Sequence, residues 1–428
     1  MSISDPVVIV GSARTPIGAF QGDLKDLTAP QLGAAAIRAA LDRAGIDRAC
    51  IDRTGILRAG IPPHETDPAS IDEVLLGCVL TAGLGQAPAR QAALGAGLPA
   101  SAGAVTINKM CASGMKAVML AHDLLLAGSA KIAVAGGMES MSNAPYLLDR
   151  ARSGYRIGHG RLIDHMFLDG LEDAYDKGRL MGTYAEDCAQ TCLFTRESQD
   201  ELALASLTRA QKATADGSFS AEIVPLTVAA GKTAGAPRTA GASRIDRIVA
   251  HDELPLKATP DKIPHLKPAF REGGTVTAAN SSAISDGAAA LVLMRRSEAD
   301  RRGLKPLAVI AGHSTFANTP ALFPTAPIGA VRGLLDRTGW SLPNIDLFEI
   351  NEAFAVVVLA AMRDLGLPHE KVNVHGGACA LGHPIGASGA RIIVTLLAAL
   401  EQRNLSRGIA SLCIGGGEAT AIAIERIT

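Results

Sequence analysis

The segment CASGMKAVMLAHDLLLAGSAKIAVAGGMES, residues 111–140, has a counterpart in GASGARIIVTLLAALEQRNLSRGIASLCIGGGEA, residues 386–419. Both copies contain Ala-Ser-Gly, a basic residue two positions on, an apolar helical run, a short apolar strand and a glycine cluster. The offset from Ala112 to Ala387 is 275. IDEVLLG at 71–77 and IDLFEIN at 345–351 match at an offset of 274. Two matches at nearly one offset predict a duplicated half-domain in which strands alternate with helices.

The remaining segments suggest how the halves are arranged. VVIVGSA at 7–13 and IAVAGG at 132–137 are continuously apolar, as in strands whose sheet is covered by helices on both faces. Residues 143–275 are a long, more charged excursion from the first half, with a helix at 198–217 that begins at Ser198 as N-cap. The low-complexity piece AAGKTAGAPRTAGAS at 229–243 is expected to be mobile. The expected units are therefore residues 1–142 with 276–303, the excursion 143–275, and residues 304–428.

Composition excludes several classes of protein. The chain has 428 residues, 48% hydrophobic and 19% charged, with a net charge of −1, which gives no electrostatic footprint for nucleic acid or an anionic membrane. No uninterrupted apolar run is expected to span a membrane. The seven cysteines have no Cys-x-x-Cys spacing, so neither a disulfide framework nor a zinc site is expected. With no leader-like pattern at the start, we expect a reducing, cytoplasmic location.

Cys111 is the first candidate for chemistry. Met115, Val118 and Met119 recur at helical spacing, which predicts a helix that begins at or just after Cys111. The free N–H groups and dipole of a helix start are expected to lower the pKa of a thiol there. On this segment alone the alternative is a small buried hydrophobe, which is what most free cysteines are.

The second half offers partners at equivalent element ends. His383 precedes Pro384 at the mouth of the matching helix, Cys413 ends a strand, and Asn351 and Glu352 follow another strand. Each has a plainer interpretation as a cap, a core residue or a loop anchor. Together, two cysteines, a histidine, an asparagine and glycine-backed N–H groups are the set that acyl transfer through a thioester needs.

Nine stretches extend this to a family resemblance. They are SARTPIGAF, GLGQAPARQAAL, NKMCASGMKAV, AGGMESMSNAPY, MGTYAEDCA, GTVTAANSSAISDGAAA, NEAFA, GGACALGHPIGASGAR and CIGGGEA. In this order they resemble the thiolases, and within them the acetoacetyl-CoA thiolases. The resemblance covers nearly the whole chain. It implies a duplicated α-β-α-β-α layered α/β fold with two similar halves and an inserted loop domain, 143–275, that covers coenzyme A and makes tetramer contacts.

The resemblance also implies roles for individual residues. Cys111 would be the nucleophile, His383 its base, and Cys413 the acid/base at the α-carbon of a second acetyl-CoA. Asn351 would hold a water that binds a thioester oxygen with His383, and the N–H groups of Cys111 and Gly415 would form a second oxyanion hole. The residues implied to line the coenzyme A tunnel are Met181, Phe270, Ala278, Ser282, Ala353 and Phe354. The implied partners are acetyl-CoA, acetoacetyl-CoA and CoA, with no metal or other cofactor, in a homotetramer built as a dimer of dimers.

Four departures from the family pattern stand beside these expectations. Residues 47–70 are an insertion, Leu180 replaces a usual histidine, His375 replaces a usual asparagine, and LFPTAP occupies 322–327. The last three leave the acyl-chain preference open. The main interpretation is reversible condensation of two acetyl-CoA molecules. The alternatives are a degradative 3-ketoacyl-CoA thiolase of broader chain length, a condensing enzyme fed by an acyl carrier protein, and a non-catalytic acyl-CoA or lipid binder.

Overall fold

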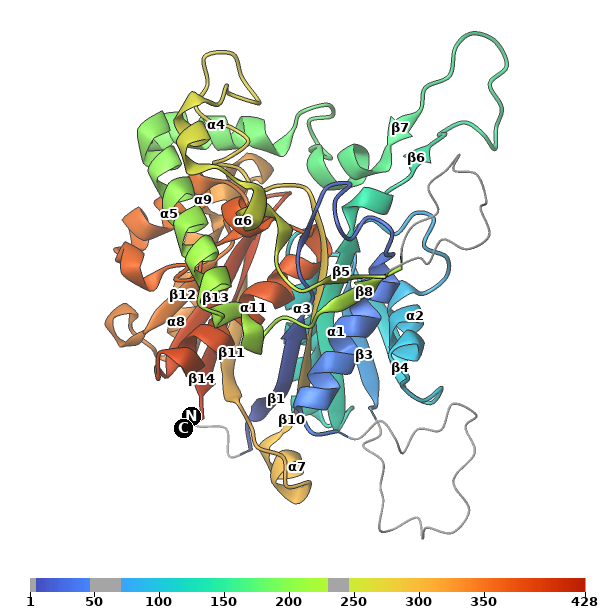
Figure 1. The fold of residues 1–428 in the computed structure, drawn as a ribbon, viewed down its shortest axis with the longest axis vertical. Helices are drawn as coiled ribbons and strands as arrows, with labels where there is room; N and C mark the ends of the chain where they lie inside the picture. Colours follow the sequence, from blue (N-terminus) through green and yellow to red (C-terminus); the bar gives the residue numbers. More distant parts are fainter. Residues whose placement is uncertain (1–4, 47–70, 230–245, 428) are drawn as a thin grey trace.

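The computed structural model describes residues 5–46, 71–229 and 246–427. The insertion at 47–70 and nearly all of the low-complexity piece at 229–243 lie outside the described residues. A large mixed sheet runs through the described part in the order β12-β13-β14-β11-β1-β10-β5-β3-β4 (Figure 1). The bounds of these strands are β12 Leu347–Ile350, β13 Arg407–Ile414, β14 Glu418–Arg426, β11 Ala308–Ala317, β1 Val7–Arg14, β10 Ser285–Arg295, β5 Ile132–Ser140, β3 Glu73–Gly77 and β4 Gly103–Ile107. A short strand β2, Gly18–Ala19, pairs with β10.

The sheet is symmetric about its centre. There β1 and β11 pair antiparallel through Val8 with Val309 and Ile9 with Ala308. Moving outward, β10 and β5 follow β1 in antiparallel pairing, as β14 and β13 follow β11. The next neighbours, β3 and β12, are parallel to β5 and β13. This matched order confirms the duplicated halves that the repeat predicts.

The repeated Ile-Asp pair has a structural reason. The carboxylate of Asp72 accepts the N–H groups of Lys131 and Ile132 at the start of β5. The carboxylate of Asp346 accepts those of Ser406 and Arg407 at the start of β13 in the same way. In each half, therefore, one aspartate fixes the register between two parallel strands.

The helices form three layers around the two half-sheets (Figure 1). α1 (Ala29–Arg43) and α2 (Pro88–Gly95) cover the outer face of the first half, and α8 (Ala326–Thr338) and α9 (Ala355–Leu365) cover that of the second. α3 (Ser113–Ala127) and α11 (Ile385–Gln402) pack against each other and against strands of both halves. The result is the expected α-β-α-β-α layering, with β1 and β5 almost fully buried.

Glycines let the two middle helices cross at their starts. A Cβ atom on Gly389 would lie 2.5 Å from the backbone nitrogen of Met115, and one on Gly137 would lie 2.0 Å from the carbonyl oxygen of Gly386. Real Cβ atoms do not approach that closely, so only glycine fits at these positions. The glycine in the second Ala-Ser-Gly motif thus brings the first turns of α3 and α11 together.

Two stretches are long and apolar enough to cross a membrane by length and composition alone: Met110–Ala127 and Ile385–Gln402. Charged side chains such as Lys116 and Arg391 interrupt them, so the expectation that no uninterrupted apolar run reaches that length is not contradicted. Within the folded chain these windows are 56% and 89% buried, because they form the middle layer of the core. Core packing accounts for their apolar character.

The excursion packs across both halves. α4 (Met181–Cys192) and α5 (Arg196–Ala215) lie against α9 of the second half. β6 (Tyr146–Leu147) and β7 (Ile163–Asp164) form the base of an arm that projects from the body (Figure 1). The paired strands β8 (Leu226–Val228) and β9 (Arg247–Val249) lie near α1, and the excursion also contains the short helix α6 (Glu253–Lys257). Two further short helices, α7 (Arg296–Arg301) and α10 (Ala378–Leu381), lie outside the excursion. The N-cap of α5 is Thr195, whose side chain accepts the N–H of Ser198, so the prediction of Ser198 as cap is wrong by one turn.

Candidate active site

Cys111 lies on a tight turn two residues before α3. Met110, just before it, has a φ of 46°, in the left-handed region that a non-glycine residue seldom adopts. Ser113 fixes this turn, because its Oγ accepts the N–H of Lys109 at 2.8 Å and donates to the carbonyl of Met110 at 2.7 Å. Such a conformation costs about 1–3 kcal/mol and persists where its surroundings enforce it. The turn holds the thiol at the mouth of α3, as the sequence predicts.

His383 occupies the equivalent place before α11. Its Nδ1 lies 2.5 Å from Oγ of Ser388, and that hydroxyl donates to the carbonyl of Pro384 at 3.0 Å. Because the hydroxyl proton points to the carbonyl, Oγ accepts from Nδ1–H. The proton of the neutral imidazole is therefore on Nδ1, and Nε2 keeps a lone pair that can accept a hydrogen bond or a proton. Ser113 and Ser388 are the serines of the two Ala-Ser-Gly motifs, and each orders the turn that carries a candidate catalytic side chain.

Asn351 lies beside His383. Its Nδ2 is 3.5 Å from Nε2 of His383, and its Oδ1 accepts from Nη2 of Arg391 at 3.4 Å. Arg391 is fully buried and also faces Glu349 at 3.5 Å. A buried cation thus holds the amide against the imidazole. Asn351 itself is buried behind His383 and does not line the cavity described next.

One cavity of about 360 Å³ contains the predicted set. Cys111, His383, Cys413 and Gly415 line it together, the last two at the end of β13. All six residues predicted to face coenzyme A also line it: Met181, Phe270, Ala278, Ser282, Ala353 and Phe354. Phe354 packs edge-on against Phe270, with ring centroids 5.9 Å apart, and lies next to Phe323 at 6.3 Å. The lining is largely apolar, as in sites that bind small molecules.

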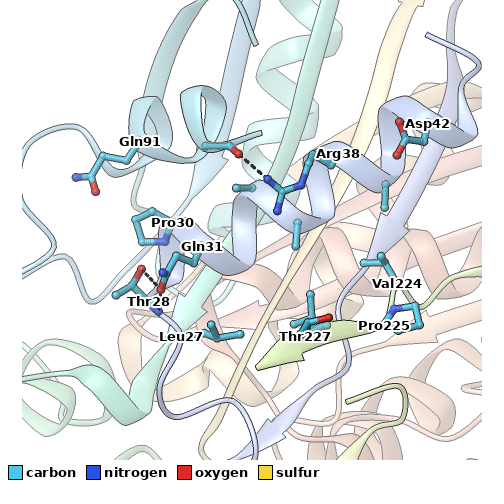
Figure 2. A pocket seen from close by; sticks show the side chains of 15 residues that line it. Leu27, Thr28, Pro30, Gln31, Arg38, Asp42, Gln91, Val224, Pro225 and Thr227 are labelled. Carbon is cyan, nitrogen blue, oxygen red and sulfur yellow. Dashed lines mark hydrogen bonds between the residues drawn. The ribbon is translucent and has the colours of Figure 1, made fainter. Parts of the chain in front are cut away.

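A larger hollow lies elsewhere on the molecule. It is an open groove of about 800 Å³ between α1 and β8 (Figure 2). Arg38 reaches across part of it to donate to the carbonyl of Gly95 at 2.6 Å, and Gln31, Gln91 and Thr227 add to its lining. None of the candidate catalytic residues lines this groove, so size alone would indicate the wrong site.

Comparison with known proteins gives the family. Residues 7–57 and 53–297 match the family model described as Thiolase, N-terminal domain, and residues 304–426 match Thiolase, C-terminal domain. The chain belongs to the thiolase family. It is 47% identical to an acetyl-CoA acetyltransferase of Cupriavidus necator, over 98% of this chain and 99% of that protein. It is 49% identical to acetyl-CoA acetyltransferase 2 of Arabidopsis thaliana, over 98% of this chain and 96% of that one.

Solved structures agree with this assignment. The acetyl-CoA acetyltransferase of Bacillus anthracis superposes with a TM-score of 0.87 at 40% identity, over 99% of both chains. The Acat5 thiolase of Ascaris suum, solved in complex with coenzyme A, superposes with a TM-score of 0.85 at 38% identity, over 99% of this chain and 100% of that one. This thiolase therefore shares the fold of solved relatives along its whole length.

The protonation states in this thiolase differ from the sequence expectation. Burial raises the pKa of the Cys111 thiol to about 11, although the N–H groups of Gly415 and of Cys111 itself oppose the change and the carboxylate of Glu139 adds to it. A helix start stabilises a negative charge by only about 0.3–1 kcal/mol, so the loss of water around the thiol outweighs it. The prediction of a lowered pKa is wrong. Burial, together with nearby Arg391, lowers the pKa of His383 to about 3, so the imidazole is neutral at pH 7.

Two further residues that the sequence singled out lie away from the cavity. The buried carboxylate of Glu352 accepts from Oγ of Ser206 at 2.7 Å, Nδ2 of Asn373 at 2.8 Å and the N–H of Cys379 at 3.0 Å, so it connects α5 and α10 with the segment at Asn373. The ring of His375 packs edge-on against Phe219 with centroids 5.9 Å apart. His375 does not line the cavity, whereas Leu180 and Phe323 do. How these positions bear on acyl-chain preference stays a prediction.

Ser388 and Arg391 are the residues that sequence reasoning missed. Both belong to the Ala-Ser-Gly-x-basic motif that was used only to detect the repeat. The signal that could have identified them is that a polar and a charged side chain recur in an otherwise apolar, fully buried helix.

The cysteines of the described residues are free thiols, as expected of a chain without a disulfide framework.

The neutral imidazole suggests a test of its role in this thiolase. With a pKa of about 11, only about one Cys111 thiol in 10⁴ is ionised at pH 7. We expect His383→Asn to slow iodoacetamide alkylation of Cys111 at pH 7 by an order of magnitude or more, because Nε2 no longer accepts the proton. As pH rises toward 11, the thiolate forms unaided and the rates of the two proteins should converge. Identical rates at every pH, measured beside the exposed-histidine control His251→Asn, would exclude His383 as the base.

Proposed function

We propose that this thiolase is an acetyl-CoA C-acetyltransferase, which condenses two acetyl-CoA molecules reversibly to acetoacetyl-CoA and CoA through an acyl-cysteine. The observation that carries the proposal is one apolar cavity lined by two cysteines, a neutral histidine and Gly415. Relatives named above as acetyl-CoA acetyltransferases match this chain over nearly their whole length, which supports the same reaction here.

The first half-reaction acylates Cys111. Its sulfur attacks the thioester carbonyl of acetyl-CoA while Nε2 of His383 takes the thiol proton, which leaves a tetrahedral oxyanion beside an imidazolium. When this intermediate collapses, the carbon–sulfur bond to coenzyme A breaks. Burial raises the pKa of the Cys413 thiol well above its usual value, so Cys413 starts protonated and gives its proton to the departing coenzyme A. An acetyl-cysteine, an imidazolium and a Cys413 thiolate remain.

The second half-reaction forms the carbon–carbon bond. The Cys413 thiolate removes a proton from the α-carbon of a second acetyl-CoA, and the imidazolium of His383, held beside Asn351, stabilises the enolate oxygen. The α-carbon attacks the acetyl group on Cys111, whose oxyanion is held by the N–H groups of Cys111 and Gly415. Collapse releases acetoacetyl-CoA, and His383 returns its proton to the Cys111 sulfur. Every proton is accounted for, and all three groups regain their starting states.

Chain length is the property that separates this function from a broader degradative thiolase. Phe323, Phe354 and Phe270 form an aromatic wall of the cavity, which limits the room for a long acyl chain. We expect thiolysis of acetoacetyl-CoA to have a kcat/KM at least tenfold above that of 3-ketooctanoyl-CoA. One methylene that does not fit a pocket costs about 1–3 kcal/mol of transition-state binding, and several cost more. Equal or higher activity on the longer substrate would contradict the narrow specificity and favour the degradative alternative.

The proposal also includes the assembly and the chemistry of the site. Nucleophile, base and acid all come from the chain, so coenzyme A thioesters are the substrates and no metal or other cofactor takes part in the reaction. The arm at 146–164 exposes Tyr146, Ile157 and Leu162 by 65%, 97% and 70%. Apolar side chains so exposed are typical of contact surfaces, which supports a homotetramer. The cytoplasmic location expected from the sequence is part of the same proposal.

A further inference from the structure

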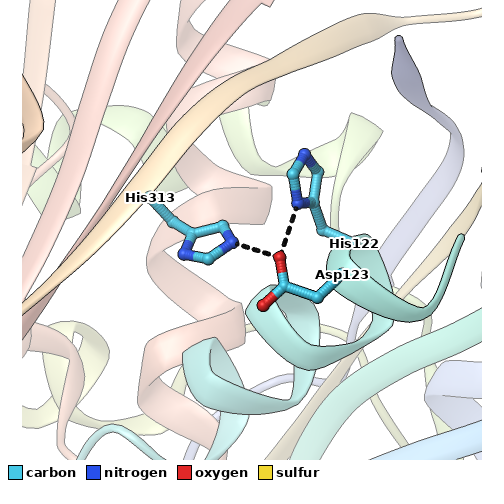
Figure 3. Close-up of side chains that lie close together, drawn as sticks. All are labelled: His122, Asp123 and His313. Carbon is cyan, nitrogen blue, oxygen red and sulfur yellow. Dashed lines mark hydrogen bonds and ion pairs between the residues drawn. The ribbon is translucent and has the colours of Figure 1, made fainter. Parts of the chain in front are cut away.

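Three potential metal-binding side chains meet at the far end of α3 from Cys111. His122 and Asp123 lie on α3, which belongs to the first half, and His313 lies on β11 of the second (Figure 3). His122 follows Ser113 by nine residues, so it is about 14 Å along the helix from the start near Cys111. The cluster is therefore separate from the cavity that contains the cysteines.

The two imidazole nitrogens meet at one carboxylate oxygen. Nδ1 of His122 lies 3.2 Å and Nε2 of His313 lies 2.9 Å from the same Oδ1 of Asp123. The three atoms lie within 4.8 Å of one another, and the two rings stand nearly perpendicular with centroids 5.0 Å apart. In a tetrahedral zinc site with bonds of about 2.0–2.1 Å, neighbouring ligand atoms are about 3.3 Å apart. The spacing on both sides of Asp123 is thus close to that of a ligand set.

The surroundings favour a cation in this position. The His122 and His313 side chains are 7% and 13% exposed, while Asp123 is 54% exposed, so the imidazoles are held by packing and the carboxylate is free to adjust. The cluster lies near the C-terminal end of α3, where the helix dipole is negative.

Two guanidinium groups also lie near the cluster. Arg295 pairs with Asp5 at 3.1 Å and donates to the carbonyl of Leu126 at 3.3 Å. Arg337 donates to the backbone carbonyl of His313 at 3.3 Å. Both guanidinium groups are directed at these acceptors rather than at the carboxylate of Asp123.

We propose that His122, Asp123 and His313 bind a divalent transition metal, with Zn²⁺ as the fitting ion, and that the bound metal joins α3 of the first half to β11 of the second. Two imidazole nitrogens and one carboxylate oxygen are ligands that Zn²⁺ prefers, and the exposed side of Asp123 leaves a fourth position for water. The site stabilises the pairing of the halves and takes no part in acyl transfer.

Co²⁺ spectroscopy on the full chain tests this proposal, because cobalt distinguishes nitrogen and oxygen ligands from thiolates. We expect the difference spectrum between wild type and His313→Gln to contain visible d–d bands and no sulfur-to-cobalt charge-transfer band. Asp123→Asn, at a half-exposed position that tolerates the change, should weaken Co²⁺ binding at least tenfold. His251→Gln, a change at an exposed histidine outside the cluster, should bind as wild type does.

Thermal unfolding with Zn²⁺ supplies a second readout, since an ion that binds only the folded state raises the Tm. Zn²⁺ should raise the Tm of wild type and His251→Gln, and should raise it much less in His313→Gln and Asp123→Asn. A flat difference spectrum, or one with a charge-transfer band, would overturn the proposal. So would equal Co²⁺ affinity and equal Zn²⁺-induced shifts in wild type and Asp123→Asn.

Discussion

Replacing Cys111 with alanine is expected to abolish both acylation and turnover, with a loss of roughly 10⁴-fold or more in kcat, while the chain still folds. The thiol is the only protein group in the proposed mechanism that forms a bond to the acetyl carbon. Its turn is held by Ser113 and by the backbone of Lys109 and Met110, which the substitution leaves in place. The measurement is steady-state thiolysis of acetoacetyl-CoA, together with a circular dichroism melt to show that the fold persists.

Cys192→Ala is the matched control for that variant. Cys192 is a free, partly exposed thiol that does not line the cavity, and its Sγ accepts from Arg363 at 3.5 Å. We expect it to keep near wild-type kcat. Substantial turnover in Cys111→Ala would end the acyl-cysteine mechanism, since no other nucleophile in the account replaces that thiol.

Replacing Cys413 with alanine is expected to separate the two half-reactions. Acetyl-CoA should still acylate Cys111, because the nucleophile and His383 remain, although coenzyme A would leave without its proton donor. Condensation should fall by about 10²–10⁴-fold, because no group is left to remove the α-proton of the second acetyl-CoA. Rapid mixing with acetyl-CoA followed by quantification of acetyl-enzyme and of acetoacetyl-CoA measures both steps in one sample.

Each alternative outcome for Cys413→Ala is informative. Wild-type condensation would mean that another group removes the α-proton. Absence of both adduct and product would mean that the two cysteines have been given the wrong separate roles. Burial of Cys413 to 1% exposure makes a small apolar replacement easy to accommodate, so a folding failure is not expected.

The repeat predicted most of the architecture because the same physical task recurs in each half. In each half an aspartate fixes two parallel strands, and a serine and a glycine order a helix start. The same residue types therefore recur at nearly the same offset, as Asp72 and Asp346 do. The central pairing of β1 with β11 could not be predicted in this way, because antiparallel pairing between two apolar strands requires no particular residue type that the sequence would show. The N-cap of α5 was misplaced because Thr195 and Ser198 are both good capping residues and only the observed turn decides between them.

The candidate site shows a similar division. The residue types and their positions at element ends were enough to predict that Cys111, His383 and Cys413 share one site, and the family resemblance added Gly415; all four line one cavity. The electrostatics were not predictable, because the pKa of Cys111 depends on how much water the folded chain removes from the thiol. The role of Ser388 depends on the direction of one hydroxyl, and the location of His375 against Phe219 depends on packing across α5.

The proposed mechanism depends on transfer of the acetyl group from acetyl-CoA to Cys111. Mass spectrometry tests this transfer directly: the wild-type chain is mixed with acetyl-CoA, quenched in acid, digested and mapped. We expect one acetyl group on the peptide that contains Cys111, absent from Cys111→Ala and discharged when CoA is added before the quench. No adduct on the wild-type protein, or an acetyl group on Cys413 or Cys379 in place of Cys111, would overturn the mechanism.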